Sequence, residues 1–234
     1  MNSEAALNIK KSFKNLTAFE LVLWLTSAVL VSVSFMLSRE YDIMTLIASL
    51  IGVTALIFVA KGDVLGLVLS VVFSVFYGII SFKCRYYGEM ITYLGMTAPM
   101  AVWSIISWVR NPFKDTSEVA VSKITKKQVV HMSVFAVLVT AAFYFILGVL
   151  GTSNLYFSTI SVTTSFCASY LSALRSPYYA LAYAANDAVL IVLWIAASFQ
   201  SISYLPMIIC FVTFLLNDLY GFYSWRHMQR RQMQ

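Results

Sequence analysis

Two asparagine–aspartate pairs are the residues of this chain best suited to chemistry, because both lie inside long apolar stretches: Asn186-Asp187 and Asn217-Asp218. An ionisable side chain in hydrocarbon costs roughly 3 kcal/mol unless it faces protein or water. Amide groups donate and accept hydrogen bonds, and carboxylates balance positive charge. Two such pairs therefore indicate a site for a flat, polar or cationic ligand. The alternative interpretation is that these side chains join neighbouring helices by hydrogen bonds.

Aromatic residues accompany both pairs at helical spacing. One stripe, at steps of four, four and seven residues, is Tyr179, Tyr183, Asp187 and Trp194. A second stripe is Thr213, Asn217, Tyr220 and Ser224. Residues at these steps share one face of a helix. On antiparallel helices that meet the same membrane face, Asp187 lies about 14 Å and Asp218 about 11 Å from that face. The two carboxyl groups are therefore expected to line one chamber with aromatic walls.

The residues expected to bind the ligand come from these stripes and from a tryptophan earlier in the chain. They are Asn186, Asp187, Trp194, Asn217 and Tyr220, with Asp218, Tyr183 and Trp103 as second choices. The two histidines, His131 and His227, have no carboxylate or cysteine at metal-ligand spacing, and the three cysteines have no CxxC spacing. A GxxxxGK[ST] phosphate loop is absent from the sequence. We therefore expect no catalytic residue, metal or cofactor.

The composition places these residues in a membrane. The 234 residues are 60% hydrophobic and only 11% charged, and the mean hydropathy is +0.81. A water-soluble protein would lack the polar surface to cover such a chain. Eight stretches have the roughly 20 apolar residues that cross a bilayer as a helix. Their ranges are 16–37, 43–60, 64–82, 89–109, 128–150, 154–174, 178–199 and 203–225.

The basic residues orient these spans. Thirteen lie in every second connection, starting with the N-terminal segment: Lys10, Lys11, Lys14, Lys61, Arg110, Lys114, Lys123, Lys126, Lys127, Arg175, Arg226, Arg230 and Arg231. The opposite side has three, Arg39, Lys83 and Arg85. Such an excess marks the cytoplasmic side, so both termini are predicted to lie in the cytoplasm. The net charge of +6 sits at helix ends near lipid headgroups, so a nucleic-acid partner is not expected.

A weak internal repeat organises the spans. The fourth span closes with aromatic residues, Ser107-Trp108 and Arg110, and the eighth closes with aromatic residues, Ser224-Trp225 and Arg226. The two closing tryptophans are 117 residues apart, and the basic residues Lys61 and Arg175 are 114 apart. Two three-helix units joined by a single helix face the same way, as in one common transporter plan. The alternative is that Ser-Trp belongs only to an interfacial aromatic belt.

The predicted architecture is thus an all-α integral membrane protein with eight transmembrane helices and two parallel three-helix repeats. Residues 1–42 hold an extra N-terminal helix, 43–110 the first repeat, 111–152 a cytoplasmic loop and a linker helix, and 153–234 the second repeat with a basic tail. Stripes of serine and glycine in the third and sixth spans indicate close helix packing. Pro99 and Pro206 free backbone carbonyls and could act as hinges, or could be tolerated kinks.

The last third of the chain resembles a known family. The residues concerned are Arg175 to Tyr179, Tyr183 to Trp194, Tyr204 to Met207 and Asn217 to Trp225. They are similar to the PnuC family of bacterial nicotinamide riboside transporters, and the similarity extends over most of the chain in helix number and in the segment from Trp103 to Trp108. The first unit departs from the second by lacking Asn-Asp pairs.

This resemblance implies a 3+1+3 fold similar to SWEET sugar carriers, with one extra N-terminal helix, assembled as a homotrimer in the bacterial cytoplasmic membrane. It implies facilitated diffusion of nicotinamide riboside, which a separate cytoplasmic kinase traps by phosphorylation. No lysine or arginine lies deep within a predicted span, as a phosphorylated substrate would require.

Three alternatives stay open. The first is a transporter of another vitamin-like or nucleoside substrate, coupled to protons through an intramembrane carboxylate. The second is a membrane receptor that binds a ligand without passing it. The third is a membrane hydrolase that uses Asp187 and Asp218 as acid and base, which we do not favour because neither histidine has a suitable partner.

Overall fold

The computed structural model describes residues 9–37, 43–114, 116–152, 154–199 and 204–234. Arg39, the predicted domain boundaries at residues 42 and 153, and the predicted start of the eighth span at residue 203 lie outside the described residues. The regular secondary structure of the described residues is helical, and β structure there is limited to isolated antiparallel bridges that join Asp63 to Glu118 and Pro112 to Val119. The prediction of an all-α protein is confirmed.

The helices follow the predicted spans closely. In chain order they are α1 (Ile9–Lys14), α2 (Ala18–Leu37), α3 (Ile43–Ala60), α4 (Val64–Lys83), α5 (Tyr87–Ile91), the π-helix η2 (Thr92–Thr97), α6 (Ala98–Val109), α7 (Lys126–Val149), α8 (Leu155–Ala173), α9 (Tyr178–Ser198) and α10 (Leu205–Gln232). Because α5, η2 and α6 run on without a break, they form the predicted fourth span.

Seven segments of the described chain are long and apolar enough to cross a membrane, with α5, η2 and α6 counted as one. Helix α8 coincides with the predicted sixth span, but it is not among the seven. Its sequence is rich in serine and threonine, and many of these side chains are buried against other helices. The polar residues that lower the hydropathy of α8 therefore face protein rather than lipid.

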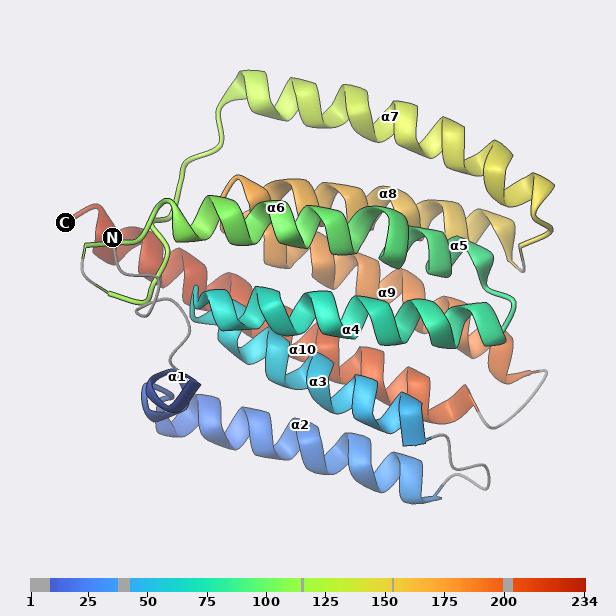
Figure 1. Cartoon of the computed structure of the whole chain (residues 1–234), viewed down its shortest axis with the longest axis horizontal. Coiled ribbons are helices and arrows are strands. Elements are labelled where there is room, and N and C mark those ends of the chain that lie inside the picture. Colours follow the sequence, from blue (N-terminus) through green and yellow to red (C-terminus); the bar gives the residue numbers. More distant parts are fainter. Residues whose placement is uncertain (1–8, 38–42, 115, 153, 200–203) are drawn as a thin grey trace.

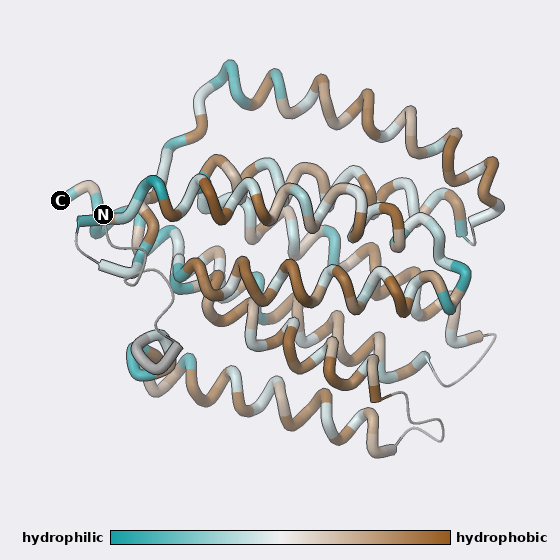
Figure 2. The backbone as a smooth tube through the Cα atoms, in the orientation of Figure 1, coloured by the Kyte–Doolittle hydropathy of each residue, from teal (hydrophilic) through white to brown (hydrophobic). Residues whose placement is uncertain are grey.

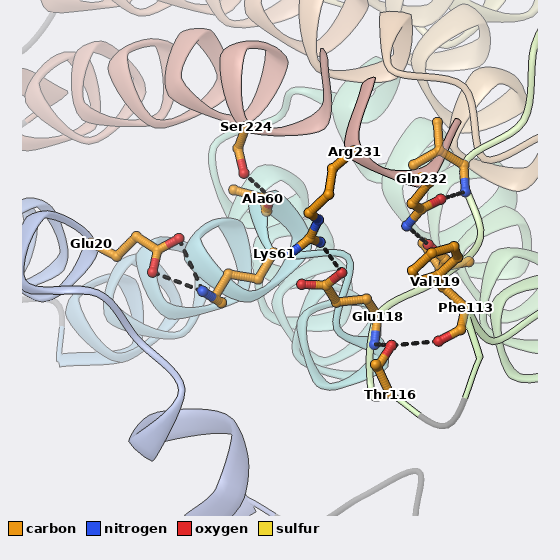
Figure 3. A network of polar contacts seen from close by, with 11 residues as sticks. Glu20, Ala60, Lys61, Phe113, Thr116, Glu118, Val119, Ser224, Arg231 and Gln232 are labelled. Carbon is orange, nitrogen blue, oxygen red and sulfur yellow. Dashed lines mark hydrogen bonds and ion pairs between the residues drawn. The ribbon is translucent and has the colours of Figure 1, made fainter. Parts of the chain in front are cut away.

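Helix α10 continues beyond the predicted end of the eighth span at residue 225 and reaches Gln232. The predicted basic tail is therefore mostly helix. Its last turns pack against the connection between α6 and α7, where the Gln232 side chain donates to the carbonyl of Val119 and accepts from the amide of Val121. Arg231 forms an ion pair with Glu118 in the same connection (Figure 3). These contacts explain why the helix does not stop at the membrane surface.

The helices lie side by side in one bundle (Figure 1). Helix α2 packs at one edge against α3 and α10, and α7 packs at the opposite edge against α8. Between them, α3, α4 and α6 contact α8, α9 and α10 mainly through the pairs α3–α10 and α6–α8. Hydrophilic residues gather at the end of the bundle that holds α1 and the last residues of α10 (Figure 2). We call this the terminal end.

The π-helix η2 interrupts the fourth span directly before a proline. Pro99 lies at the start of α6, where its ring cannot donate a hydrogen bond and crowds the preceding turn. A single wide π turn accommodates such a disturbance, and these turns occur often at functional sites. Here the wide turn contributes the buried side chains of Tyr93 and Thr97 to the interior of the bundle.

Close packing of α3 on α4 generates a first prediction. A Cβ atom at Gly66 would lie 2.3 Å from the backbone nitrogen of Val59 and 2.7 Å from the carbonyl oxygen of Ala55. Gly66→Ala should therefore destabilise the protein by about 2 kcal/mol through overpacking. The control is Gly148→Ala on α7, where the nearest atom would lie 3.9 Å away. Thermal unfolding in detergent measures both; equal melting temperatures would contradict this packing.

Candidate functional site

A cavity of about 70 Å³, lined by both apolar and polar residues, lies inside the bundle, between α3, α4, η2 and α6 on one side and α8, α9 and α10 on the other. It has room for several water molecules. Its polar lining consists of Ser70, Ser74, Tyr93, Thr97, Ser104, Ser169, Ser172, Tyr179, Tyr183, Asn186, Asp187 and Asp218. No lysine or arginine is among the described residues that line it.

Four of the eight residues predicted to bind a ligand line this cavity. Tyr183, Asn186 and Asp187 come from α9, and Asp218 comes from α10. The two aspartates are almost completely buried, and their carboxyl groups lie close enough to interact directly. One oxygen of Asp187, Oδ2, has no hydrogen-bond partner. Two adjacent acids with an unused oxygen form a place that attracts a cation or a hydrogen-bond donor.

Asn186 is held in place by three hydroxyl groups of α8. Its Oδ1 lies 2.8 Å from Thr164 Oγ1, 3.1 Å from Ser165 Oγ and 3.2 Å from Ser161 Oγ. The amide oxygen is therefore turned toward α8, which leaves the amide nitrogen for the cavity that the residue lines. Residues of the predicted serine stripe in α8 thus position a polar side chain in addition to packing closely.

Asn217 and Tyr220 point away from the cavity, toward α2. Asn217 donates from Nδ2 to Ser27 Oγ at 3.0 Å, and the Tyr220 hydroxyl donates to Glu20 Oε1 at 2.9 Å. Glu20 also forms an ion pair of 2.9 Å with Lys61 (Figure 3). In this structure the two residues attach the N-terminal helix to α10, which is the interhelical role that the sequence left open as an alternative.

The two tryptophans predicted for the site also lie off the cavity. Trp194 is fully buried and donates from Nε1 to the Tyr77 hydroxyl at 3.0 Å, among the rings of Tyr86 and Tyr204. Trp103 is 49% exposed on the outside of α6. Neither tryptophan is among the described residues that line the cavity, so we do not include them in the candidate site.

Aromatic rings pack at both ends of the cavity. At the end away from the terminal end, Phe73, Tyr93 and Phe214 line the cavity and contact Tyr77 and Phe211 behind them. At the terminal end, Tyr179 lines the cavity and packs edge-on against Trp225 at 4.8 Å, and Trp225 packs against Trp108 at 5.2 Å. The polar chamber therefore lies between two aromatic clusters.

The tryptophans of the terminal end are fixed by reciprocal hydrogen bonds. Ser107 and Trp108 of α6 donate to the carbonyls of Ala173 and Ser172 at the end of α8. Ser224 and Trp225 of α10 donate to the carbonyls of Ala60 and Val59 at the end of α3; the Ser224 contact is drawn in Figure 3. We call this arrangement the Ser-Trp latch. It ties the helix group α3, α4 and α6 to the helix group α8, α9 and α10 at two equivalent places, the end of α8 and the end of α3.

The turns that follow α3 and α8 also match. Gly62 and Arg175 both have positive φ, 68° and 56°. The carbonyl of Gly62 accepts from Val119 and that of Arg175 accepts from Ser122, so the α6–α7 connection crosses both turns. The sequence paired Lys61 with Arg175, whereas the backbone pairs Gly62 with Arg175, 113 residues apart. Glycine favours this conformation, which costs arginine about 1 kcal/mol.

Glu89 is a buried acid that the sequence reasoning passed over. It lies on α5 and is fully buried, and its Oε2 lies 3.2 Å from Ser161 Oγ. The predicted fourth span began at residue 89, so the acid counted as an end residue. The sequence signal that could have identified it was the position of Glu89 at the very start of a long apolar stretch. The phenylalanines of the cavity, Phe73 and Phe214, could not be distinguished in the sequence from ordinary core residues.

A bundle of long apolar helices around a buried cavity with polar side chains defines a multi-pass membrane protein. Residues 42–227 match the model of the family described as nicotinamide mononucleotide transporter. The chain therefore belongs to this transporter family, which is not a family of enzymes.

A relative named nicotinamide riboside transporter PnuC, from Neisseria mucosa, is 24% identical over 190 residues, which is 79% of this chain and 72% of the relative. The crystal structure of the vitamin B3 transporter PnuC has the same fold, with a TM-score of 0.82 and 23% identity over 95% of this chain and 97% of that one. The resemblance to the PnuC family read from the sequence is confirmed.

The different surroundings of the two asparagines give a second prediction. Asn217→Ala removes one hydrogen bond between α10 and α2, so it should lower stability by about 1 kcal/mol and leave ligand affinity nearly unchanged. Asn186→Ala removes a cavity donor, so it should weaken ligand binding about tenfold. Melting temperature and calorimetric titration with nicotinamide riboside, the compound for which the Neisseria mucosa relative is named, measure the two effects. A larger loss of affinity for Asn217→Ala would place the site elsewhere.

Proposed function

We propose that the protein carries nicotinamide riboside across the membrane by facilitated diffusion. The observation that supports this most strongly is the cavity itself, which combines two acids, an amide and several aromatic rings with no basic side chain among its described lining residues. Nicotinamide riboside has a planar pyridinium cation, a carboxamide and ribose hydroxyls. Each of these groups has a complementary partner among the lining residues.

The assignment of partners follows from charge and shape. The carboxyl groups of Asp187 and Asp218 balance the pyridinium charge, since a cation between two acids relieves their repulsion. Phe73, Tyr93 and Phe214 offer ring faces and edges for the flat pyridinium. Asn186 donates to an acceptor of the ligand. Tyr183, whose hydroxyl lies 3.1 Å from Ser169 Oγ, takes part in a polar pair on the cavity wall.

The nucleoside is favoured over its phosphorylated form. The family description mentions the mononucleotide, and the relative from Neisseria mucosa is named for the riboside. A phosphate group is normally bound by arginine, lysine or several backbone N–H groups. The described lining residues of this cavity offer acids instead. A phosphate would lie next to Asp187 and Asp218 and be repelled.

Two parallel three-helix units around the cavity form the architecture that we propose, with eight transmembrane helices in total. Several lining residues pair at the spacing of the Ser-Trp latch and its turns. Pairs 113 residues apart are Leu56 and Ser169, Val59 and Ser172, Ser70 and Tyr183, Phe73 and Asn186, and Ser74 and Asp187. Pairs 117 apart are Thr97 and Phe214, and Ala101 and Asp218. This spacing supports residues 43–110 and 153–234 as the repeats, with residues 1–42 as the extra helix and residues 111–152 as the linker.

Rocking of one unit against the other would expose the cavity to each side in turn. We propose that the Ser-Trp latch is the cytoplasmic gate and that the cluster around Tyr77, Tyr93 and Phe211 is the outer gate. The common location of α1 and the end of α10 supports cytoplasmic positions for both termini (Figure 1). The setting would be the bacterial cytoplasmic membrane, with the protein as a homotrimer and a kinase that traps the substrate after entry.

Transport by purified protein in proteoliposomes tests this function, and the charge balance gives the third prediction. Labelled nicotinamide riboside should equilibrate without accumulation, and inside substrate should drive counterflow. Asp187→Asn should weaken uptake of nicotinamide riboside about tenfold, because a charge-assisted contact is lost, and should affect an uncharged carba analogue with a reduced ring much less.

The control for that experiment is Asp63→Asn, an acid that caps α4 outside the cavity. Three results would contradict the proposal in different ways. Accumulation against the gradient would indicate coupling to an ion, binding without counterflow would indicate a receptor, and equal losses for both ligands would indicate that Asp187 is a helix contact.

The latch gives the fourth prediction. Trp225→Phe keeps the ring but removes the Nε1 donor to Val59, so the cytoplasmic gate should open more often. In a protein with the native cysteines replaced, Ser104→Cys reports access to the cavity near this gate. Labelling by an impermeant thiol reagent from the cytoplasmic side should become about fivefold faster, as expected for one hydrogen bond.

Trp103→Phe is the matched control, because Trp103 belongs to the same helix as Trp108 and is half exposed. Trp108→Phe should act like Trp225→Phe, since its indole makes the equivalent bond to Ser172. Unchanged labelling in both latch variants would remove the latch from the gating mechanism.

A further inference from the structure

Glu89 is an acid that the proposed binding mode does not use. It is fully buried on α5 and does not line the cavity. The ion pairs among the described residues join Lys61 to Glu20 and Arg231 to Glu118, so neither involves Glu89. Its Oε1 has no hydrogen-bond partner. A carboxylate in this place would be an uncompensated charge inside a membrane protein, which is far more costly than a neutral carboxylic acid.

Ser161 connects this acid to the cavity. Its hydroxyl oxygen lies 3.2 Å from Glu89 Oε2 and 3.2 Å from Asn186 Oδ1. A hydroxyl group has one hydrogen, so it can donate to only one of these oxygens. Both contacts are hydrogen bonds only if Glu89 carries a proton and donates to Ser161, and Ser161 then donates to Asn186. A carboxylate at Glu89 would instead take the hydrogen of Ser161.

The direction of this chain decides which end of the Asn186 amide faces the ligand. With Ser161 as a donor, all three α8 hydroxyls that contact Asn186 Oδ1 hold the amide oxygen against α8. The amide N–H group is then left for the cavity. With Ser161 turned toward a carboxylate, its lone pairs would face Asn186 and attract the amide nitrogen away from the cavity.

We propose that Glu89 is a positioning residue, a neutral acid whose proton orders the chain Glu89–Ser161–Asn186 so that Asn186 presents a hydrogen-bond donor to the substrate. Under the proposed function, the group that receives this bond is the carboxamide oxygen of nicotinamide riboside. The acid acts through Ser161 and does not touch the substrate. This inference rests on the proposed function for the identity of the ligand, but not for the protonation of Glu89.

Infrared difference spectroscopy of detergent-purified protein at neutral pH tests the protonation directly, without a ligand. The wild-type protein should show a carbonyl band of a protonated carboxylic acid that Glu89→Gln lacks. Gln is neutral, similar in shape and able to donate to Ser161, so this variant should fold and bind nicotinamide riboside about as well as the wild type. Absence of the band, or failure of Glu89→Gln to fold, would overturn the proposal.

The dependence of affinity on pH tests the positioning role. As the pH rises and Glu89 loses its proton, the wild-type dissociation constant should rise about fivefold more than that of Glu89→Gln, as for one lost hydrogen bond. The other titratable groups in electrostatic contact with Glu89 are Tyr77 of α4, Tyr86 before α5 and Tyr93 of η2. They and the cavity acids occur in both proteins, so their effects cancel in the comparison.

Ser161→Ala provides a second variant that interrupts the chain. It should remove the Glu89-dependent part of the pH profile while the infrared band of Glu89 persists. Parallel pH profiles of the wild type and Glu89→Gln would overturn the positioning role. If nicotinamide riboside does not bind the wild-type protein at all, the proposed function fails, and the infrared result still decides whether Glu89 is a neutral acid.

Discussion

The need to satisfy polar groups inside a membrane protein governs this structure. Without water around the bundle, each buried polar side chain must find its partner on another helix. Asn217 donates to Ser27, Glu20 forms an ion pair with Lys61, and Asn186 accepts from the hydroxyls of α8. Asp187 and Asp218 are different, because their remaining partner positions face a cavity and one oxygen of Asp187 is unused. The same constraint therefore distinguishes side chains that build the bundle from side chains that the proposed function assigns to a ligand.

Contacts between the two helix groups place that cavity at their common boundary. The Ser-Trp latch joins them at the terminal end through indole and hydroxyl donors on helix-end carbonyls. Aromatic packing around Tyr77 and Phe211 joins them at the other end. The latch is also packed, since Trp108 and Trp225 are buried and lie ring against ring. In the proposed rocking mechanism, the contacts at one end would separate while those at the other end keep the two groups together.

Much of the fold could be predicted from the sequence. The length of an apolar stretch indicates that it crosses the lipid, and the basic residues of the connections indicate the cytoplasmic side. The site was harder to predict. Asn217 and Asp218 are adjacent, so they point about 100° apart on a helix, and only the position of α2 decides which one is covered. That helix lies outside the repeat, and its packing leaves no periodic signal in α10. Trp194 and Trp103 match the composition of a binding site, yet an indole serves equally well in a core or on a lipid-facing surface.

In the proposed binding mode, the two buried acids meet the positive charge of nicotinamide riboside inside the cavity. A structure of the protein with nicotinamide riboside bound, at a resolution that shows ring orientation, measures this most directly. We expect the pyridinium ring to lie between the carboxyl groups of Asp187 and Asp218 and the aromatic side chains of Phe73, Tyr93 and Phe214. Density for the ligand outside this cavity, or a ring that faces Asn217 and Tyr220 instead, would contradict it.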